Sequence, residues 1–352
     1  METRKFLVTV DGENRWGVLF QATPDADAGG EDVFVPMRTK EDAVRYARIC
    51  EQRTDAVAHI AEQGEIVLGK IAIMYDFDKT LTTKDQQEFT FIPMVQMEPE
   101  EFWEKSNELA KAKKMDSILA YMHIMLHEAK YRNTSIRRGA FVECGRDLEY
   151  FPGVESWFGR VNRFCAGMGI ELEHYIISSG LREIIEGSAI YHEFRDVYAC
   201  EFFYDPDGVA IWPKNVVNYT TKTQFVFRIN KGVPDLSDDQ TLNEYIPEED
   251  RPIPFRNMIY IGDGLTDVPC MRLVKANGGY SIAVYTNEAK VRGLIENKRV
   301  DFIAPADYSE GRELEELVKD ILIKISTEDK LAAISKRQRA ECAGARLDMQ
   351  RF

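Results

Sequence analysis

The chain has 352 residues, a formal net charge of -14, 44% hydrophobic residues and 30% charged residues. At roughly 100 to 200 residues per domain, this length predicts two or three folded units, and the composition is typical of an ordered globular protein. The acidic balance argues against nucleic acid as a partner, because binding a polyanion depends on lysines and arginines that displace counterions. There is no run of about 18 apolar residues and no secretion signal at the start, so we expect a cytoplasmic protein without a membrane span.

The first 69 residues have the pattern of a small α+β domain. Apolar segments of strand length alternate with polar turns, and one amphipathic segment begins at Thr39, whose hydroxyl is suited to capping a helix. The expected order is strand, strand, strand, helix and strand, at residues 5–10, 15–23, 32–37, 39–53 and 57–68.

After this unit the chain alternates between apolar strands and amphipathic helices. Segment 71–75 is apolar throughout and is followed at once by acids, which is typical of a strand that is buried on both faces and ends in a polar crevice. Segments 171–180 and 257–264 repeat this design. Strands that alternate with helices predict a doubly wound, Rossmann-like parallel sheet of the α/β class, which binds ligands beyond the carboxyl ends of its strands.

Two segments interrupt this alternation. Residues 85–150 lack strand patterns and show apolar spacings of three and four, with Asp116 as a helix cap, so we expect a helical insertion. Residues 197–212 have the pattern of a hairpin around the turn DPDG. The predicted boundaries are 1–69 for the first domain, 70–84 and 151–327 for the α/β core, 85–150 for the insertion and 328–352 for a basic C-terminal tail, which can be helical up to Gly344.

Asp76 and Asp78 lie two residues apart, immediately after the strand predicted at 71–75. In a turn that leaves a strand, both carboxylates can face one crevice while Phe77 between them points into the protein. Phosphoryl transfer needs such a pair, because one carboxylate attacks phosphorus and the other donates a proton to the departing oxygen. Taken alone, the motif is equally compatible with a turn that carries two solvated acids.

The sequence DFDKTLT at 76–82 resembles the first motif of the haloacid dehalogenase (HAD) superfamily, in its phosphatase branch. Companion motifs follow in the order typical of that superfamily. IISSG resembles the second motif, GDGLTD resembles the fourth, and FPGV resembles the return from an inserted cap to the core. The resemblance covers about residues 70–325 and implies a HAD core with a helical cap of the phosphoserine-phosphatase type.

The resemblance also implies roles for individual residues. Asp76 is expected to attack phosphorus and form an aspartyl-phosphate, with Asp78 as general acid and then general base. Ser178 and Ser179 are expected to bind phosphoryl oxygens. A magnesium ion, Mg²⁺, is expected on Asp76, the backbone carbonyl of Asp78, Asp263 and Asp267.

The third motif of the superfamily is a lysine, which we assign to Lys222. Thr220 or Thr221 can cap a helix there and place the lysine in its first turn. A cation near a helix amino terminus is electrostatically disfavoured, so a purely structural role leaves Lys222 unexplained. Lys214 and Lys231 remain alternatives.

The expected substrate is a small phosphorylated metabolite, because a helical cap that closes over a site limits access by large surfaces. Phosphoserine is one candidate among amino-alcohol, sugar and nucleotide monophosphates, and Asp85, Arg137 and Arg138 are candidate substrate contacts. Two alternatives stay open. One is a non-catalytic scaffold with a vestigial HAD core, and the other is a HAD-type phosphotransferase.

Overall fold

A computed structural model describes residues 6–10, 16–20, 33–36 and 69–349. The chain divides into two compact units, 1–67 and 68–352. In the first unit, three strands form an antiparallel sheet in the order β1-β2-β3. The strands are β1 (Phe6–Val10), β2 (Trp16–Phe20) and β3 (Val33–Pro36). The helix expected at 39–53, with Thr39 as its cap, and the strand expected at 57–68 lie outside the described residues.

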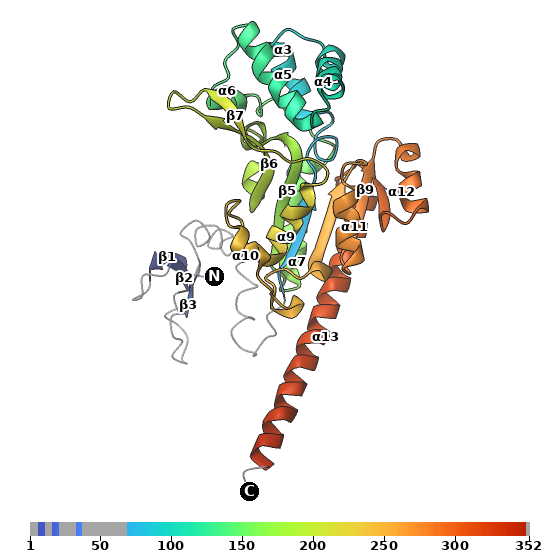
Figure 1. The fold of residues 1–352 in the computed structure, drawn as a ribbon. Helices are drawn as coiled ribbons and strands as arrows, with labels where there is room; N and C mark the ends of the chain where they lie inside the picture. Colours follow the sequence, from blue (N-terminus) through green and yellow to red (C-terminus); the bar gives the residue numbers. More distant parts are fainter. Residues whose placement is uncertain (1–5, 11–15, 21–32, 37–68, 350–352) are drawn as a thin grey trace, which may run out of the picture. The chain divides into compact units, whose positions relative to one another are not determined.

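The second unit contains a seven-stranded sheet in the order β10-β9-β8-β4-β5-β6-β7 (Figure 1). All neighbouring strands run parallel except the edge pair of β6 and β7, which forms the predicted hairpin. The α/β fold class is therefore confirmed. The strands are β4 (Ile71–Tyr75), β5 (Leu172–Leu181), β6 (Asp196–Tyr204), β7 (Ala210–Asn215), β8 (Met258–Gly262), β9 (Tyr280–Tyr285) and β10 (Phe302–Pro305).

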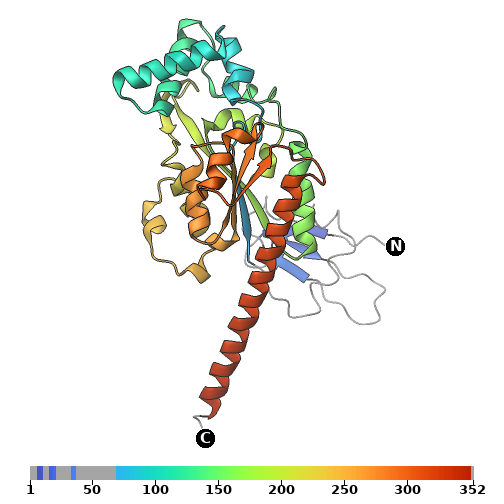
Figure 2. The same ribbon diagram turned by 90° about the vertical axis from the view of Figure 1, so that its right-hand side faces the viewer.

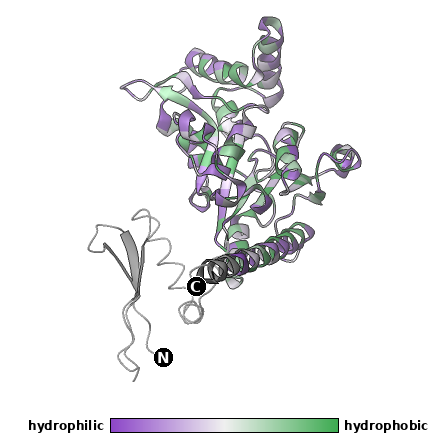
Figure 3. Ribbon diagram, turned by 60° about the horizontal axis from the view of Figure 1, so that its bottom comes forward, coloured by the Kyte–Doolittle hydropathy of each residue, from purple (hydrophilic) through white to green (hydrophobic). Residues whose placement is uncertain are grey.

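Strand β4 lies in the middle of this sheet, and all five of its residues are buried. Its apolar run explains this place, because a strand covered on both faces gains from burying every side chain. Hydrophobic colouring accordingly runs along the strands of the sheet (Figure 3). Tyr75 at the end of β4 is in register with Ile176 of β5 and Ile261 of β8. The residues that follow these three positions therefore share one edge of the sheet.

Helices cover both faces of the sheet, with α9 and α11 on one side and α7 and α13 on the other (Figure 2). Shorter helices connect the remaining strands. The helices of the core are α7 (Val154–Gly167), α8 (Arg182–Glu186), α9 (Lys222–Lys231), α10 (Asp239–Asn243), α11 (Val268–Ala276), α12 (Arg292–Glu296) and α13 (Glu313–Met349). Among the described helices, none combines the length and apolarity that crossing a bilayer requires.

Helix α13 continues without a break through residue 328, where a separate tail was predicted. Its first turns are part of the core, since Leu314, Val318 and Leu322 are fully buried. Beyond Asp329 its described side chains are exposed or half-buried. The same helix therefore begins as a core element and becomes more exposed beyond Asp329, in the part whose side chains the structure describes.

The predicted insertion between β4 and α7 is helical and lies at one end of the sheet (Figure 1). We refer to residues 85–150 as the cap. The carboxylate of Asp116 caps α5 as predicted, because its Oδ1 accepts from the backbone N–H groups of Ile118 and Leu119. The cap helices are α2 (Gln86–Phe89), α3 (Phe91–Met94), α4 (Pro99–Lys113), α5 (Ser117–Tyr131) and α6 (Arg138–Glu143).

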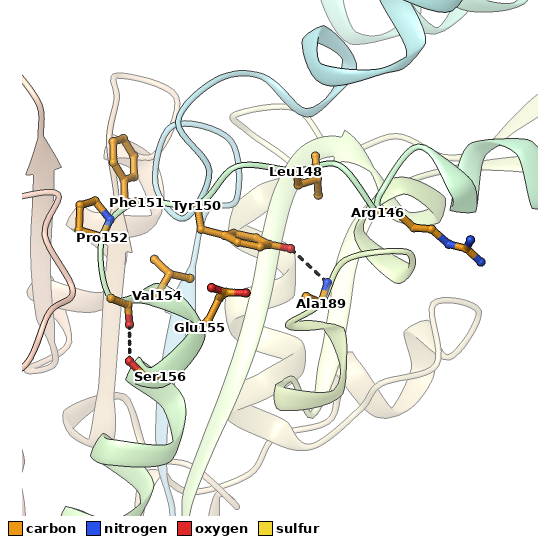
Figure 4. Close-up of a pocket in the computed structure, with 10 residues that line it drawn as sticks. Arg146, Leu148, Tyr150, Phe151, Pro152, Val154, Glu155, Ser156 and Ala189 are labelled. Carbon is orange, nitrogen blue, oxygen red and sulfur yellow. Dashed lines mark hydrogen bonds between the residues drawn. The ribbon is translucent and has the colours of Figure 1, made fainter.

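Two chain segments connect the cap to the core, and they run side by side. Thr82 and Tyr150 form an isolated antiparallel bridge, and the N–H of Phe151 donates to the carbonyl of Leu81 at 2.9 Å. A pocket lies beside these two connecting segments, and within it the hydroxyl of Tyr150 accepts from the N–H of Ala189 (Figure 4). None of the residues that line this pocket is one of the predicted site residues.

Candidate active site

Asp76 and Asp78 occupy the turn that leaves the central strand β4. The N–H of Asp76 donates to the carbonyl of Ile261 at 2.9 Å, which ties the turn to β8. Phe77 is fully buried, as expected for the residue between two acids that face a crevice. Lys79 has a φ of 58°, a left-handed conformation that costs a non-glycine residue roughly 1 kcal/mol or more. The turn is therefore held in an unusual shape by its surroundings.

Lys222 is the first residue of α9 and reaches the acids at the strand ends. Its Nζ lies 3.0 Å from Oδ1 of Asp76 and 2.7 Å from Oδ1 of Asp267, and its side chain is fully buried. Burial alone would lower the pKa of Lys222, but the carboxylates of Asp267 and Asp76 outweigh burial and raise it above its usual value. The two carboxylates therefore favour the charged form of Lys222, which lies in contact with Asp76.

The two alternative lysines bind elsewhere. Lys214 on the edge strand β7 pairs with Glu201 at 2.8 Å. Lys231, at the far end of α9, donates to the backbone carbonyls of Leu242 and Glu244. Lys222 is the member of the trio that meets the aspartates.

The threonine cap predicted for α9 is not observed. Thr221 precedes the helix but has helical dihedral angles and makes no side-chain cap hydrogen bond. A side-chain cap requires an extended backbone, so this conformation removes it. Asn218 takes over instead, because its Oδ1 accepts from the N–H groups of Thr220 and Thr221 at 3.0 and 2.9 Å.

Asp76, Asp263 and Asp267 form an acidic cluster in which one ligand atom from each lies within 4.8 Å of the others. Burial and the neighbouring Asp267 raise the pKa of Asp76, and burial with Asp267 raises the pKa of Asp263 to about 7. Carboxylates so close together repel one another unless a cation compensates them. Oxygen donors of this kind fit a hard divalent ion such as Mg²⁺.

Asp267 is the most enclosed member of the cluster, with no exposed surface. Its Oδ1 accepts from Nζ of Lys222 and from the hydroxyl of Tyr260, the latter at 2.8 Å. Gly262 permits this approach, since a Cβ there would lie 2.6 Å from Cγ of Asp267. Asp267 therefore orients Lys222 in addition to adding charge to the cluster.

Asp78 lies outside the acidic cluster, and a residue of the cap donates a hydrogen bond to its carboxylate. Its Oδ1 accepts from the N–H of Gln86, the first residue of α2, at 2.8 Å. A Cβ on Gly180 would lie 2.7 Å from Oδ2 of Asp78, so a glycine is needed on β5. Burial, followed by the charge of Asp85, raises the pKa of Asp78 to about 7. Asp78 is thus able to exchange a proton near neutral pH.

Ser178 and Ser179 lie at the end of β5, within the strand rather than after it. Ser178 is fully buried, and its Oγ accepts from the N–H of Gly180 at 2.9 Å. Its hydroxyl hydrogen can therefore still be donated. The carbonyl of Ser179 accepts from the hydroxyl of Tyr121, which comes from cap helix α5, at 2.7 Å.

The three candidate substrate contacts in the cap already have protein partners. Asp85 pairs with Lys79 at 2.5 Å. Arg137 donates to the carbonyl of Asp207 in the hairpin turn, and Arg138 pairs with Glu186 of α8. A role in substrate binding for these residues stays a prediction.

Three residues that shape the site were not found in the sequence: Gln86, Asn218 and Tyr260. Each makes a hydrogen bond to a residue of another element, and that contact has no local pattern in the sequence. Tyr260 had the clearest signal, because a tyrosine in a fully buried strand needs a partner for its hydroxyl.

Fold and site together define an α/β protein with a lysine-linked acidic cluster at the carboxyl ends of its central strands. The chain belongs to the haloacid dehalogenase-like hydrolase family, whose model matches residues 73–272, more than half of the chain. The superfamily resemblance of the sequence is therefore confirmed.

Individual relatives are more distant. An uncharacterized protein of Borreliella burgdorferi is 28% identical over 273 residues, which cover 69% of this chain and 93% of that protein. Among solved structures, a phosphoserine phosphohydrolase-like protein from Francisella tularensis is similar at 21% identity and a TM-score of 0.43, covering 70% of this chain and 98% of that one. A HAD family hydrolase from Salmonella enterica serovar Typhi is similar at 13% identity and a TM-score of 0.46, covering 88% and 90%.

Proposed function

We propose that this chain is a magnesium-dependent phosphatase that hydrolyses a small phosphomonoester through an aspartyl-phosphate on Asp76. The observation that carries the proposal is the contact of Asp76 with the buried ammonium of Lys222 beside Asp263 and Asp267. A hydrolase that uses a carboxylate as nucleophile needs positive charge at the oxygens of the transferred group. A buried lysine whose charged form is favoured by two carboxylates, and which lies against the nucleophile, meets this need.

In the first step an oxygen of Asp76 attacks phosphorus, and the bond between phosphorus and the leaving oxygen breaks. Asp78 gives its proton to that oxygen, and the alcohol departs. In the second step Asp78 takes a proton from water, the water oxygen attacks phosphorus, and the bond to Asp76 breaks. Inorganic phosphate is released, and both aspartates return to their initial state.

The remaining residues bind the transferred group. Lys222 and the hydroxyl of Ser178 donate to its equatorial oxygens, where charge accumulates, and Ser179 is a further donor. Asp76, Asp263 and Asp267, with the backbone carbonyl of Asp78, would hold a magnesium ion, which neutralises charge on the phosphoryl oxygens when bound.

The substrate is a metabolite-sized phosphomonoester, for which phosphoserine is one candidate. The cap supports a small substrate because it is joined to the core by two adjacent segments and contacts the end of β5 through Tyr121. A screen of phosphorylated amino alcohols, sugars and nucleosides identifies the preferred one.

The proposal is tested by hydrolysis of p-nitrophenyl phosphate by the wild type and by Asp76→Asn, each with Mg²⁺ and with a chelator. We expect wild-type activity that is lost on chelation and restored by Mg²⁺, and an Asp76→Asn rate lower by about 10³-fold or more. Equal background rates in both proteins would instead favour a scaffold with a vestigial core. Transfer to an added alcohol that exceeds release of inorganic phosphate would identify a phosphotransferase.

A further inference from the structure

Cap helix α5 touches the core at its first turn through Asp116. Oδ1 of Asp116 caps α5, whereas Oδ2 accepts from Nδ2 of Asn218 at 3.0 Å. Asn218 belongs to the core and lies 102 residues further along the chain. One carboxylate therefore serves two purposes, with one oxygen for the cap helix and the other for the core.

Asn218 in turn organises the start of α9. Its Oδ1 accepts from the N–H groups of Thr220 and Thr221, its N–H donates to Oγ1 of Thr221 at 2.8 Å, and its carbonyl accepts from the N–H of Lys222 at 2.9 Å. These bonds also fix the orientation of the Asn218 amide. If its oxygen and nitrogen were exchanged, Nδ2, which is a donor, would face the two donating N–H groups of Thr220 and Thr221.

A second contact joins the same helix to the other side of the site. The hydroxyl of Tyr121, which is almost fully buried, donates to the carbonyl of Ser179, and Sγ of Cys200 donates to the same carbonyl at 3.3 Å. The thiol of Cys200 also accepts from the N–H of Val217, the neighbour of Asn218, at 3.3 Å. The two contacts of α5 therefore meet adjoining parts of the core.

We infer that Asn218 is a positioning residue for the reaction. Its hydrogen bond to Asp116 couples closure of the cap to the placement of Lys222 against Asp76. When the bond is made, the first turn of α9 is held and Lys222 lies where a phosphoryl oxygen binds. When the cap opens, Asn218 loses its partner while Oδ1 of Asp116 still caps α5, so the cap helix survives opening. The inference rests on the proposed phosphatase function.

The contact can be tested by exchanging the two side chains between positions 116 and 218. Asp116→Asn keeps the cap of α5, because asparagine caps helices about as well as aspartate, but it brings two amide donors together. Asn218→Asp keeps the acceptor for Thr220 and Thr221 but brings two acceptors together. The double variant restores one donor and one acceptor with the direction of the bond reversed. Asp238→Asn is the matched control, since Asp238 caps α10 through the N–H of Thr241 and takes no part in the contact.

We expect each single variant to lower kcat/KM for p-nitrophenyl phosphate about tenfold, the loss expected from one hydrogen bond to a charged group. The double variant and Asp238→Asn should lie within about threefold of the wild type. A purely structural role of Asp116 as a helix cap would leave Asp116→Asn unchanged. Single variants that keep wild-type activity, or a double variant no better than the singles, would overturn the inference.

Amide hydrogen exchange of residues 216–222 gives a readout that needs no substrate. Exchange in this segment should be faster in both single variants than in the wild type, and should return to the wild-type rate in the double variant. If the wild type hydrolyses no phosphomonoester, the proposed function fails. The hydrogen exchange rates of the four proteins still show whether Asp116 and Asn218 are coupled. Identical exchange in all four proteins would show that they are not.

Discussion

The core side of the site and its cap side are built in different ways. On the core side, Asp76, Asp267 and Lys222 are buried and joined by contacts of 3.0 Å or less. On the cap side, Arg137 and Arg138 are exposed and pair with surface groups. Buried charges hold one arrangement because leaving any of them unpaired is costly, whereas exposed pairs contribute little and exchange partners easily. The buried ion pairs of the core therefore hold one arrangement, whereas the exposed pairs of Arg137 and Arg138 can be exchanged for other partners.

Lys222→Met removes the buried ion pairs on the core side of the site and has the largest expected effect. Removing one partner from a buried ion pair leaves uncompensated carboxylates, so we expect the free energy of unfolding without Mg²⁺ to fall by about 3 to 5 kcal/mol. We expect kcat/KM to fall by about 10³-fold, because the cation at the phosphoryl oxygens is lost. Chemical denaturation and steady-state kinetics measure the two effects.

Lys214→Met is the matched control, because the side chain of Lys214 is 52% exposed and pairs with Glu201 away from the acidic cluster. This variant should match the wild type in both measurements. A loss in Lys214→Met as large as that in Lys222→Met would remove the distinction between a buried catalytic pair and a surface pair.

Asp78→Asn separates the proton donor from the nucleophile. The variant cannot protonate a leaving group, so kcat/KM for an alkyl phosphate should fall by about 10² to 10⁴-fold. p-Nitrophenolate leaves without a proton, so kcat/KM for its phosphate should fall much less. Equal losses for the two substrates would contradict the role of Asp78 as the acid.

Tyr260→Phe sharpens the comparison within the core. It removes one hydrogen bond from Asp267, so we expect the free energy of unfolding to fall by about 1 kcal/mol and kcat to fall several-fold. Tyr75→Phe is a matched control on the neighbouring strand, because its hydroxyl bonds to Trp157 and His174 instead. That control should lose similar stability and keep its activity, as thermal unfolding and kinetics would establish.

The sequence predicted the core better than the contacts between elements. The apolar run at 71–75 and the acids that follow it mark a central strand and its polar end, because both depend on neighbouring residues only. Lys222 was assigned from the superfamily resemblance and its place in the first turn of a helix, and the structure brings it to the aspartates. The threonine cap assigned to that helix was wrong, because Thr221 adopts helical dihedral angles. Asn218 supplies the cap from three residues earlier.

Contacts between distant segments could not be predicted. Gln86 reaches Asp78 from a cap helix, and Asn218 reaches Asp116 across 102 residues, so neither has a periodic or spacing signal. Arg137 and Arg138 illustrate the same limit, since a pair of arginines in a cap does not reveal whether surface acids or a substrate will bind them. Such pairings depend on how distant segments pack together, and the residues next to each partner in the sequence carry no signal of that packing.

The central claim is that Asp76 becomes phosphorylated. Asp78→Asn offers the most direct test, because an aryl phosphate can still react with Asp76 while the second step lacks its base. We expect a burst of nitrophenolate of about one equivalent per enzyme and, after an acid quench, a phosphoryl group on the peptide that contains Asp76, located by mass spectrometry. A burst without this adduct, or an adduct that persists in the double variant Asp76→Asn/Asp78→Asn, would contradict the account.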